Sequence, residues 1–412
     1  MKKGVITIIL LLFIQAFIHN LGHPITPDFV KDLGIEDFYF GIFFALMSLG
    51  LVVGGPFWGI LGDHRKKSLL ILIGLLIYSI GQFAFGNIHN IYIMVIVRFV
   101  SGFGVSASVT LLLTLLIERS DLSHKTRNIA YGTAATGFGA SLSYLLGGRL
   151  PKFLIDYSSY TVQSTTLANV DAGEIVFALQ AILNVVFAFV VFYIIRQNEV
   201  VIVSESKSNP FAGLKEIKSL DSNLIVFLIS LTLVSIGAIN ISKFTEVYIS
   251  DLHQGSEGIG NFVFVTGIVG IITAIFIVPI IIKMKKDINR MIMINILSGI
   301  IIFIVFRMNA IIIGLYSVFM IYVILKAIYG PLETSFISSF AKDNEHGKLM
   351  GIRQSFFAIG FVIGPLIGGF IYDYNPLLVF DISVLMFILA SIMILFVRRN
   401  LIRLKRKEII EE

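Results

Sequence analysis

Apolar stretches long enough to cross a lipid bilayer recur along almost the whole of this 412-residue chain. A membrane-spanning helix needs about 20 predominantly apolar residues, because each residue advances the helix by about 1.5 Å. Twelve such stretches lie at residues 4–23, 39–61, 69–87, 91–117, 129–149, 174–195, 223–247, 259–282, 289–306, 309–338, 349–372 and 376–397. Charged residues make up 14% of the chain, against about 25% in soluble proteins. The sequence therefore predicts an all-α polytopic membrane protein with twelve transmembrane helices.

The placement of lysine and arginine predicts the orientation of these helices, because cytoplasmic loops are enriched in both residues. With a cytoplasmic N-terminus, 24 of the 32 Lys and Arg residues lie in cytoplasmic segments and four lie in outer loops. We therefore expect both termini in the cytoplasm and a multi-pass protein of the cytoplasmic (inner or plasma) membrane. The net charge of +6 has the same explanation, so we expect no nucleic-acid partner.

A polar, mixed-charge segment separates two sets of six apolar stretches. The expected domains are an N-terminal six-helix half at 1–196, a cytoplasmic linker at 197–222, a C-terminal six-helix half at 223–400 and a charged cytoplasmic tail at 401–412. The halves also share a glycine pattern at a constant offset of 221 residues. It matches Gly139, Gly147 and Gly148 to Gly360, Gly368 and Gly369. Parallel six-helix repeats, with a substrate site near the membrane midplane, are typical of one large class of secondary transporters.

The residues available for chemistry argue against an enzyme. The chain has no cysteine, and its seven histidines are scattered and lie mostly in predicted loops. It also contains no Gly-x-x-x-x-Gly-Lys-Ser/Thr loop, which would bind a nucleotide. We therefore expect no catalytic residues, no metal site and no cofactor, and transport driven by an ion gradient rather than by ATP.

The loop after the second apolar stretch resembles a signature of the major facilitator superfamily. Gly59 opens the pattern, Asp63 is its acid and Lys67 closes it, while His64 and Lys66 depart from the usual residues. The resemblance implies a conformational gate, in which Gly59 lets the second span approach the eleventh. Asp63 would then lie at the N-terminal end of that helix, where an anion is stabilised by roughly 0.3–1 kcal/mol.

Three further patterns extend this resemblance over the whole chain. Arg98, Gly102 and Gly104 resemble the Arg-x-x-x-Gly-x-Gly pattern in the fourth span of proton-coupled members. The fifth span resembles the drug-antiporter signature, but Ser143-Tyr144 replaces its Gly-Pro pair. The glycine face of the fifth span consists of Gly139, Gly147 and Gly148. The glycine face of the eleventh span consists of Gly360, Gly364, Pro365 and Gly368. Small residues at four-residue spacing permit close helix approach, so both faces are predicted to belong to the conformational gate.

Arg98 is the candidate coupling residue of the N-terminal half. A charged residue inside a span costs at least about 2.5 kcal/mol, so Arg98 is expected to face protein or water. The first span places three polar residues at a similar depth, and we expect Arg98 to meet Gln15, His19 or Asn20. A histidine can titrate near neutral pH, which would suit proton coupling.

The C-terminal half supplies acids within its spans. Glu246 follows Lys243 by three residues, which also suits a solvated pair on one helix face. Glu333 and Lys326 lie deep in the tenth span, where burial and the lysine would set the pKa of the acid. Glu246, Glu333 and Lys326 therefore complete the predicted proton-coupling site. Asp381 is interpreted as structural, and Arg353 fits either a snorkelling residue or a substrate contact.

These patterns predict a secondary active transporter that moves a small organic solute by alternating access. The resemblance to the bacterial drug:proton antiporter group implies proton-coupled efflux of drugs or lipophilic metabolites. Two alternatives stay open at this point. One is uptake or export of a sugar, an amino acid or a lipid-linked glycoside, and the other is a non-transporting receptor on the same fold. The expected partners are a small-molecule substrate, the proton and the lipid bilayer, and the protein is expected to be a monomer.

Overall fold

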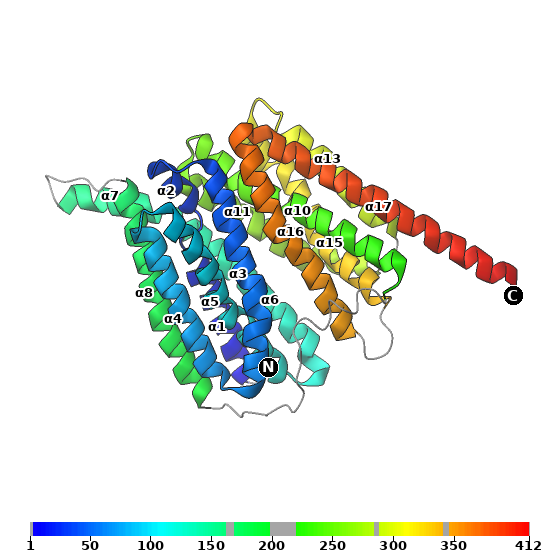
Figure 1. Ribbon diagram of the computed structural model, residues 1–412, viewed down its shortest axis with the longest axis horizontal. Coiled ribbons are helices and arrows are strands. Elements are labelled where there is room, and N and C mark those ends of the chain that lie inside the picture. The colour runs from blue at the N-terminus through cyan, green and yellow to red at the C-terminus, as the bar shows by residue number, and fades with distance from the viewer. Residues whose placement is uncertain (1–2, 162–168, 198–219, 284–287, 341–345, 412) are drawn as a thin grey trace. The chain divides into compact units, whose positions relative to one another are not determined.

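The computed structural model describes residues 3–161, 169–197, 220–283, 288–340 and 346–411, and this part of the chain is helical without strands. Figure 1 shows its helices in chain order. The long helices are α1 (Lys3–Asn20), α3 (Asp37–His64), α4 (Lys67–Asn87), α5 (Ile91–Glu118), α6 (Lys125–Gly147), α8 (Asn169–Arg196), α10 (Ser222–Asp251), α11 (Gly255–Ile272), α13 (Ile288–Val305), α15 (Val318–Ser338), α16 (His346–Tyr374) and α17 (Pro376–Glu411). The short elements are α2 (Thr26–Asp32), η1 (Leu122–His124), α7 (Leu150–Thr161), η3 (Thr273–Ile277), α12 (Val278–Lys283) and α14 (Ile311–Tyr316).

Eleven helical segments in the described ranges are long and apolar enough to cross a membrane. They confirm all the predicted spans except the fifth, residues 129–149, which corresponds to α6. This helix has 23 residues but contains many Gly, Ser and Thr residues, which lower its hydropathy. Most of the predicted linker lies outside the described residues, and α17 continues without a break into the predicted tail at 401–412.

The chain forms two compact units. The first comprises residues 1–210 together with 246–268, and the second comprises 211–245 together with 269–412. Helix α10 therefore contributes its first part to the second unit and its end to the first. In the first unit, α4 packs against both α5 and α8, and α1 packs against α6. In the second, α13 packs against α15 and α17.

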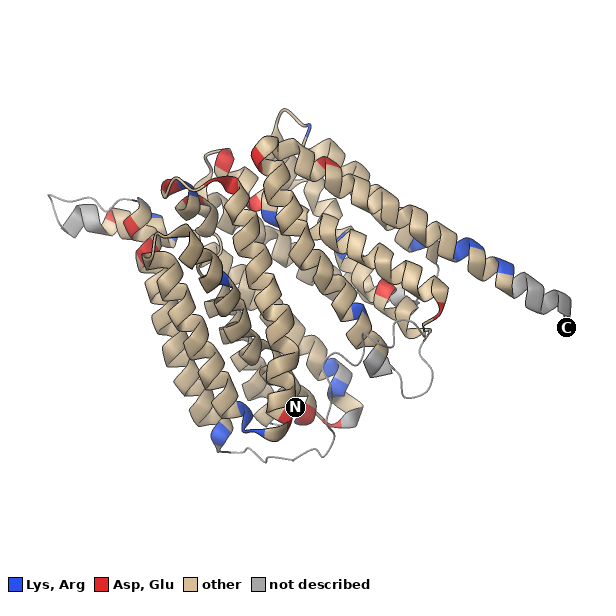
Figure 2. Cartoon of the chain, in the orientation of Figure 1, with Lys and Arg blue, Asp and Glu red and all other residues tan. Residues whose placement is uncertain are grey.

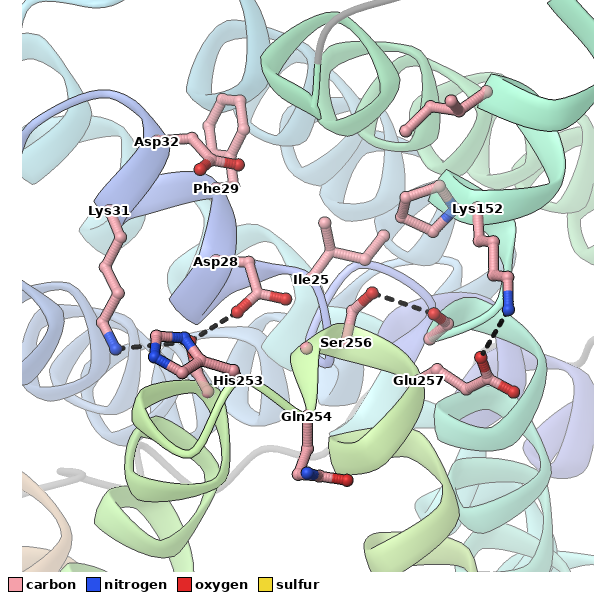
Figure 3. A pocket seen from close by; sticks show the side chains of 15 residues that line it. Ile25, Asp28, Phe29, Lys31, Asp32, Lys152, His253, Gln254, Ser256 and Glu257 are labelled. Carbon is pink, nitrogen blue, oxygen red and sulfur yellow. Dashed lines mark hydrogen bonds and ion pairs between the residues drawn. The ribbon is translucent and has the colours of Figure 1, made fainter. Parts of the chain in front are cut away.

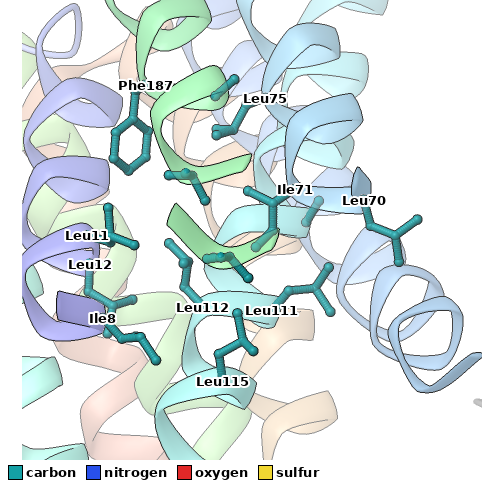
Figure 4. Close-up of a cluster of buried hydrophobic side chains, with 14 of the residues drawn as sticks. Ile8, Leu11, Leu12, Leu70, Ile71, Leu75, Leu111, Leu112, Leu115 and Phe187 are labelled. Atoms are coloured by element: carbon teal, nitrogen blue, oxygen red, sulfur yellow. The ribbon is translucent and has the colours of Figure 1, made fainter. Parts of the chain in front are cut away.

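The core of the first unit is a cluster of mainly aliphatic side chains from α1, α3, α4, α5 and α8. Figure 4 shows Ile8, Leu75 and Leu112 among the residues that fill it. Large apolar side chains are also exposed along many of the long helices, as Ile80 and Phe370 illustrate. Lipid solvates such side chains in a membrane-spanning helix, so an outward apolar surface is expected here. Charged residues gather near helix ends, with few in between (Figure 2).

Glycines allow α3 and α5 to approach each other closely. The backbone of α5 at Phe99 and Phe103 occupies the space that a Cβ at Gly50 would need. Reciprocally, the backbone of Met47 in α3 occupies the space beside Gly102. Gly102, predicted as part of the span-four pattern, is therefore used for helix packing. Such close approach increases dispersion contacts, which stabilise helix pairs where apolar burial gives no advantage over lipid.

The internal repeat is visible in the helix pairs within each unit. In the first unit the glycine face of α6 packs on α1, since Gly139 lies against the Phe13 carbonyl and Gly147 against the Leu21 carbonyl. In the second unit the equivalent face of α16 packs on α10, where Gly360, Gly364 and Gly368 lie against Ser235, Ile239 and Phe244. Pro365 lies inside α16 and removes one backbone hydrogen bond there. The same pair of spans in each half is thus held together by the same glycine pattern.

The α3–α5 contact generates a stability prediction. Gly50→Ala should lower the thermal stability of the purified protein, because overpacking a tight contact costs about 1–3 kcal/mol. Gly137→Ala is the matched control, because a Cβ there meets no heavy atom within 4 Å. The control should leave stability unchanged or raise it by up to about 1 kcal/mol, since alanine favours helix more than glycine does. Equal melting temperatures for the two variants would contradict the packing argument.

Candidate functional site

Arg98 is buried in the first unit and is held by unusual partners. It is 4% exposed, and its guanidinium carbon lies 3.4 Å from the centroid of the Phe85 ring. Nη1 faces the Met47 sulfur at 4.0 Å, and Nε has no hydrogen-bond partner in the described residues. A cation over an aromatic face is attracted by the ring quadrupole, which offsets part of the desolvation of the charge.

Among the described residues, Arg98 makes no hydrogen bond to the three residues of the first span that it was predicted to meet. Instead, His19 Nδ1 lies 3.1 Å from the Tyr78 hydroxyl, and the Asn20 amide donates to the Ala16 carbonyl at 2.8 Å. Gln15 is buried, and its amide nitrogen has no partner among the described residues. The sequence did not indicate Tyr78, because one tyrosine in an apolar stretch resembles ordinary core. It lies between His19 and Arg98 and is fully buried.

Space beside Arg98 is limited. A cavity of about 10 Å³ is lined by His23, Thr26, Phe40, Phe43, Phe44, Met47 and Arg98. That is close to the smallest volume that can hold one water molecule. This cavity beside Arg98 is therefore large enough for about one water molecule.

Glu246 is buried in the first unit, where α10 ends. It is 3% exposed, and the Tyr144 hydroxyl lies 3.3 Å from each of its carboxyl oxygens. The low exposure of the carboxyl disfavours a solvent-exposed position for Glu246, and the alternative of a pair with Lys243 stays a prediction. Tyr144 is one of the two residues that replace the Gly-Pro pair of the span-five signature. Because Tyr144 stands where the family pattern has another residue, its hydroxyl can donate a hydrogen bond to the buried carboxyl of Glu246.

Glu333 is buried in the second unit and is paired with Arg353. Its side chain is 1% exposed, while that of Arg353 is 20% exposed. Arg353 Nε donates to Glu333 Oε1 at 3.0 Å, and Nη2 donates to the same oxygen. The prediction that Lys326 supplies the positive charge beside Glu333 is therefore wrong. That charge comes from Arg353 of α16, and not from a residue of α15. Arg353 contacts Glu333 in this structure, and its two predicted roles, as a snorkelling residue or as a substrate contact, stay predictions.

Lys326 lies on the same face of α15 as Glu333 but has no ion pair among the described residues. Asp381, by contrast, forms an ion pair with Arg307 at 2.9 Å near the ends of α17 and α13, which agrees with its structural interpretation.

A polar network joins α2 to the end of α10 in the first unit. Lys31 Nζ donates to Ser250 Oγ at 3.2 Å and pairs with Asp251, and Ser250 donates to Asp28. The backbone of Ser256 also hydrogen-bonds to Asp28. Burial raises the pKa of the Asp28 carboxyl, although the hydrogen bond from Ser250 and the charge of Lys31 oppose the rise. The sequence did not indicate this network, because most of its members belong to segments predicted to be loops.

This network forms one wall of a cavity of about 560 Å³. Figure 3 shows Asp28, Lys31, Asp32 and His253 on one side and Lys152 and Glu257 on the other, with Ser256 between them. Lys152 and Arg149 each lie 3.6 Å from a Glu257 carboxyl oxygen. Ser256 Oγ donates to the Gly148 carbonyl at 2.9 Å, so Gly148 of the predicted gate contacts the start of α11. Burial also raises the pKa of Asp32, and the charge of Asp28 adds to this rise.

The predicted gate loop is partly anchored within the first unit. Lys67 Nζ pairs with Glu118 at 3.1 Å, which joins the start of α4 to the end of α5. Asp63 is exposed, and a Cβ at Gly59 would make ordinary contact with Thr110 of α5. The predicted approach of Gly59 and Asp63 to the eleventh span stays a prediction.

Asp28 generates a prediction of pH dependence. Its pKa lies above the ordinary value of 3.8 in the folded protein, so the folded state binds the proton more tightly than the unfolded state. The fold is therefore most favoured while Asp28 is protonated and loses stability as pH rises from about 3.8 through the raised pKa. Asp28→Asn removes this loss, because the amide stays neutral and its oxygen still accepts from Ser250.

Thermal unfolding of the purified protein across a pH series measures this effect. The melting temperatures of wild type and Asp28→Asn should converge at low pH, and the variant should become relatively more stable as pH rises. Asp373→Asn, a change at an exposed acid, should run parallel to the wild type throughout. A parallel profile for Asp28→Asn as well would contradict the prediction.

Comparisons with known proteins agree with this architecture. The family model described as Major Facilitator Superfamily matches residues 8–341 and 291–409. The chain is 22% identical to the quinolone resistance protein NorA of Staphylococcus aureus, covering 89% of this chain and 90% of the relative. It is also 22% identical to multidrug resistance protein 2 of Bacillus subtilis, over 91% and 92% of the two chains.

Solved structures show the same fold at low identity. The nucleoside transporter NupG matches with a TM-score of 0.72 and 14% identity, over 95% of this chain and 99% of that one. A D-xylose–proton symporter matches with a TM-score of 0.67 and 15% identity, over 95% and 96%. The family model covers most of the chain, and the internal helix repeat agrees with it. The chain belongs to the Major Facilitator Superfamily and is a membrane transporter rather than an enzyme.

Proposed function

We propose that this transporter couples proton movement to the efflux of drugs or lipophilic metabolites across the cytoplasmic membrane. The observation that carries the proposal is the buried Glu333–Arg353 pair. Two relatives support the export direction, since their names describe resistance to quinolones and to multiple drugs. The predicted orientation, with both termini in the cytoplasm, and a monomeric state belong to the same proposal.

The chemistry of the pair suits a proton-coupled cycle. Removing one partner of a buried ion pair leaves an uncompensated charge, which costs about 3–5 kcal/mol. Protonation of Glu333 removes its charge and weakens the interaction with Arg353 without leaving a buried carboxylate unpaired. A proton delivered to Glu333 can therefore separate α15 from α16. That step would link proton binding to a change in conformation.

Glu246 is the second candidate for proton binding. Its carboxyl accepts a hydrogen bond from the Tyr144 hydroxyl. A neutral donor tolerates both the charged and the protonated carboxyl, so this contact survives titration. In this proposal Arg98, with Tyr78 and His19 beside it, supplies the positive charge of the N-terminal helices. Gln15 and Asn20 are the accompanying polar groups of α1.

The glycine faces supply the moving contacts of the proposed cycle. Gly139 and Gly147 in α6 and Gly360, Gly364 and Gly368 in α16 leave smooth helix surfaces against α1 and α10. Helices in such contact can slide with few side-chain rearrangements. We propose that Gly59, Asp63 and Lys67 form the cytoplasmic gate that releases and re-forms during transport.

Glu333 provides the main test of proton coupling. Glu333→Gln should abolish accumulation driven by a proton gradient in proteoliposomes, because glutamine mimics the protonated carboxyl and cannot release a proton. Gradient-independent exchange of a transported drug across the same membrane should persist. Substrate-induced proton flux, followed with a pH-sensitive dye, measures the coupling directly.

Asp381→Asn is the matched control, since it removes an acid from the Arg307 ion pair at the helix ends of the same unit. This variant should retain proton flux. Undiminished proton flux in Glu333→Gln would overturn the assignment. Absence of any transport by the wild type, together with tight ligand binding, would favour a receptor instead.

A further inference from the structure

The cavity of about 560 Å³ in the first unit has no part in the proposed transport cycle. Its walls come from α2, from the start of α7 and from the junction of α10 with α11. All of these segments belong to the first unit. The volume lies within the range of about 300–1,000 Å³ that is typical of sites for small organic compounds. The cavity is therefore large enough for a ligand of its own.

The α2 side of this cavity carries two carboxyl groups that form no ion pair among the described residues. Asp28 and Asp32 are four residues apart on α2, so they lie one turn apart on the same helix face. Asp28 accepts a hydrogen bond from the Ser250 hydroxyl, and Asp32 has no hydrogen-bond partner in the described part of the chain. The cation on this side, Lys31, pairs with Asp251 instead. This side therefore presents negative charge to the cavity.

The α7 side has the opposite excess. Lys152 Nζ and Arg149 Nε each lie 3.6 Å from a carboxyl oxygen of Glu257, so two cations share one acid. Arg149 does not line the cavity, and it also donates to the Asn261 side chain at 3.1 Å. The Lys152 side chain lines the cavity and is 72% exposed. Its ammonium group is therefore accessible to a ligand.

Apolar side chains from both sides complete the wall. Ile25 and Phe29 contribute from the α2 side and are almost fully buried. Pro151 and Ile155 contribute from α7. Figure 3 shows the carboxyl groups of α2 and the ammonium group of Lys152 on opposite sides of the cavity. The cavity thus combines an acidic side, a basic side and apolar surface.

This separation of charge decides which class of ligand fits. A purely cationic compound is attracted by Asp28 and Asp32 but repelled by Lys152, and a purely anionic compound experiences the reverse. A zwitterion can satisfy both sides at once. Burial raises the pKa of the Asp28 carboxyl, and the charge of Asp28 adds to the rise at Asp32. An ammonium group beside the two carboxylates offsets this unfavourable arrangement.

We propose that this cavity binds zwitterionic organic compounds, with the ammonium group at Asp28 and Asp32 and the anionic group at Lys152. The apolar body of the compound contacts Ile25 and Phe29. In the predicted orientation the cavity lies on the outer side of the membrane. The inference depends neither on proton coupling nor on the direction of transport.

The chain contains no cysteine, so one introduced thiol can report directly whether the cavity is occupied. Gln254 lines the cavity and is exposed, so Gln254→Cys in the full-length protein should react with a water-soluble maleimide. Three probes share a benzene ring and differ in charge. They are zwitterionic 4-(aminomethyl)benzoate, its cationic methyl ester and anionic 4-methylbenzoate.

We expect the zwitterion to slow the labelling of Gln254→Cys in a saturable manner, and the other two probes to have little effect at the same concentration. Tyr374→Cys, at an exposed residue that does not line the cavity, should be labelled at the same rate with and without each probe. Equal protection by the ester or by 4-methylbenzoate would overturn the selectivity for zwitterions. Absence of protection by the zwitterion would overturn the site.

Substitutions in the Gln254→Cys protein test the two charged sides separately. Asp32→Asn and Lys152→Gln should each weaken the apparent affinity of the zwitterion about threefold, because exposed ion pairs are partly screened by water. Adding Asp28→Asn to Asp32→Asn should weaken it about tenfold or more, since hydrogen bonds to charged groups are the stronger ones. Asp373→Asn, at an exposed acid outside the cavity, should leave protection unchanged. Unchanged affinity in Lys152→Gln and in the double aspartate variant would overturn the assignment.

The same assay distinguishes this inference from the proposed transport function. Protection that persists in Glu333→Gln supports a site separate from the proton-coupling pair. Protection that Glu333→Gln abolishes, while Asp32→Asn and Lys152→Gln leave it intact, would overturn the cavity site. Proton flux without protection would overturn the cavity site alone, and protection without any transport would support the cavity site and count against the proposed function.

Discussion

The cost of placing a charge inside a membrane-spanning helix governs the arrangement of this protein. The charges in the spans are met in different ways. Arg98 lies over an aromatic ring and beside a thioether, Glu333 is bound by Arg353, and Glu246 accepts from a tyrosine hydroxyl. These three contacts differ in how easily a change of protonation disrupts them. A ring face attracts a cation whatever the pH, whereas an ion pair responds to protonation of its acid.

In the proposed cycle, helix packing allows these charge pairs to separate and re-form. In both units the glycine faces of α6 and α16 lie against α1 and α10, with neighbouring atoms in the space that side chains would fill. Such surfaces lack interlocking side chains, so their relative movement needs few rotamer changes. Helix α16 also carries Arg353, whose partner Glu333 lies on α15. Changing the protonation of one acid can therefore alter how a whole helix packs.

Periodicity and composition alone determined the helical membrane fold and the repeated glycine pattern, because lipid restricts spanning segments to long apolar helices. They also identified Arg98, Glu246, Glu333 and Lys326 as charges that need an explanation. Only the tertiary structure decided their partners. Tyr78, Tyr144 and Arg353 come from other helices, and the Asp28–Lys31–Ser250 network joins segments more than 200 residues apart. Spacing along one helix reports which residues share a face, but which helix lies opposite depends on how helices pack.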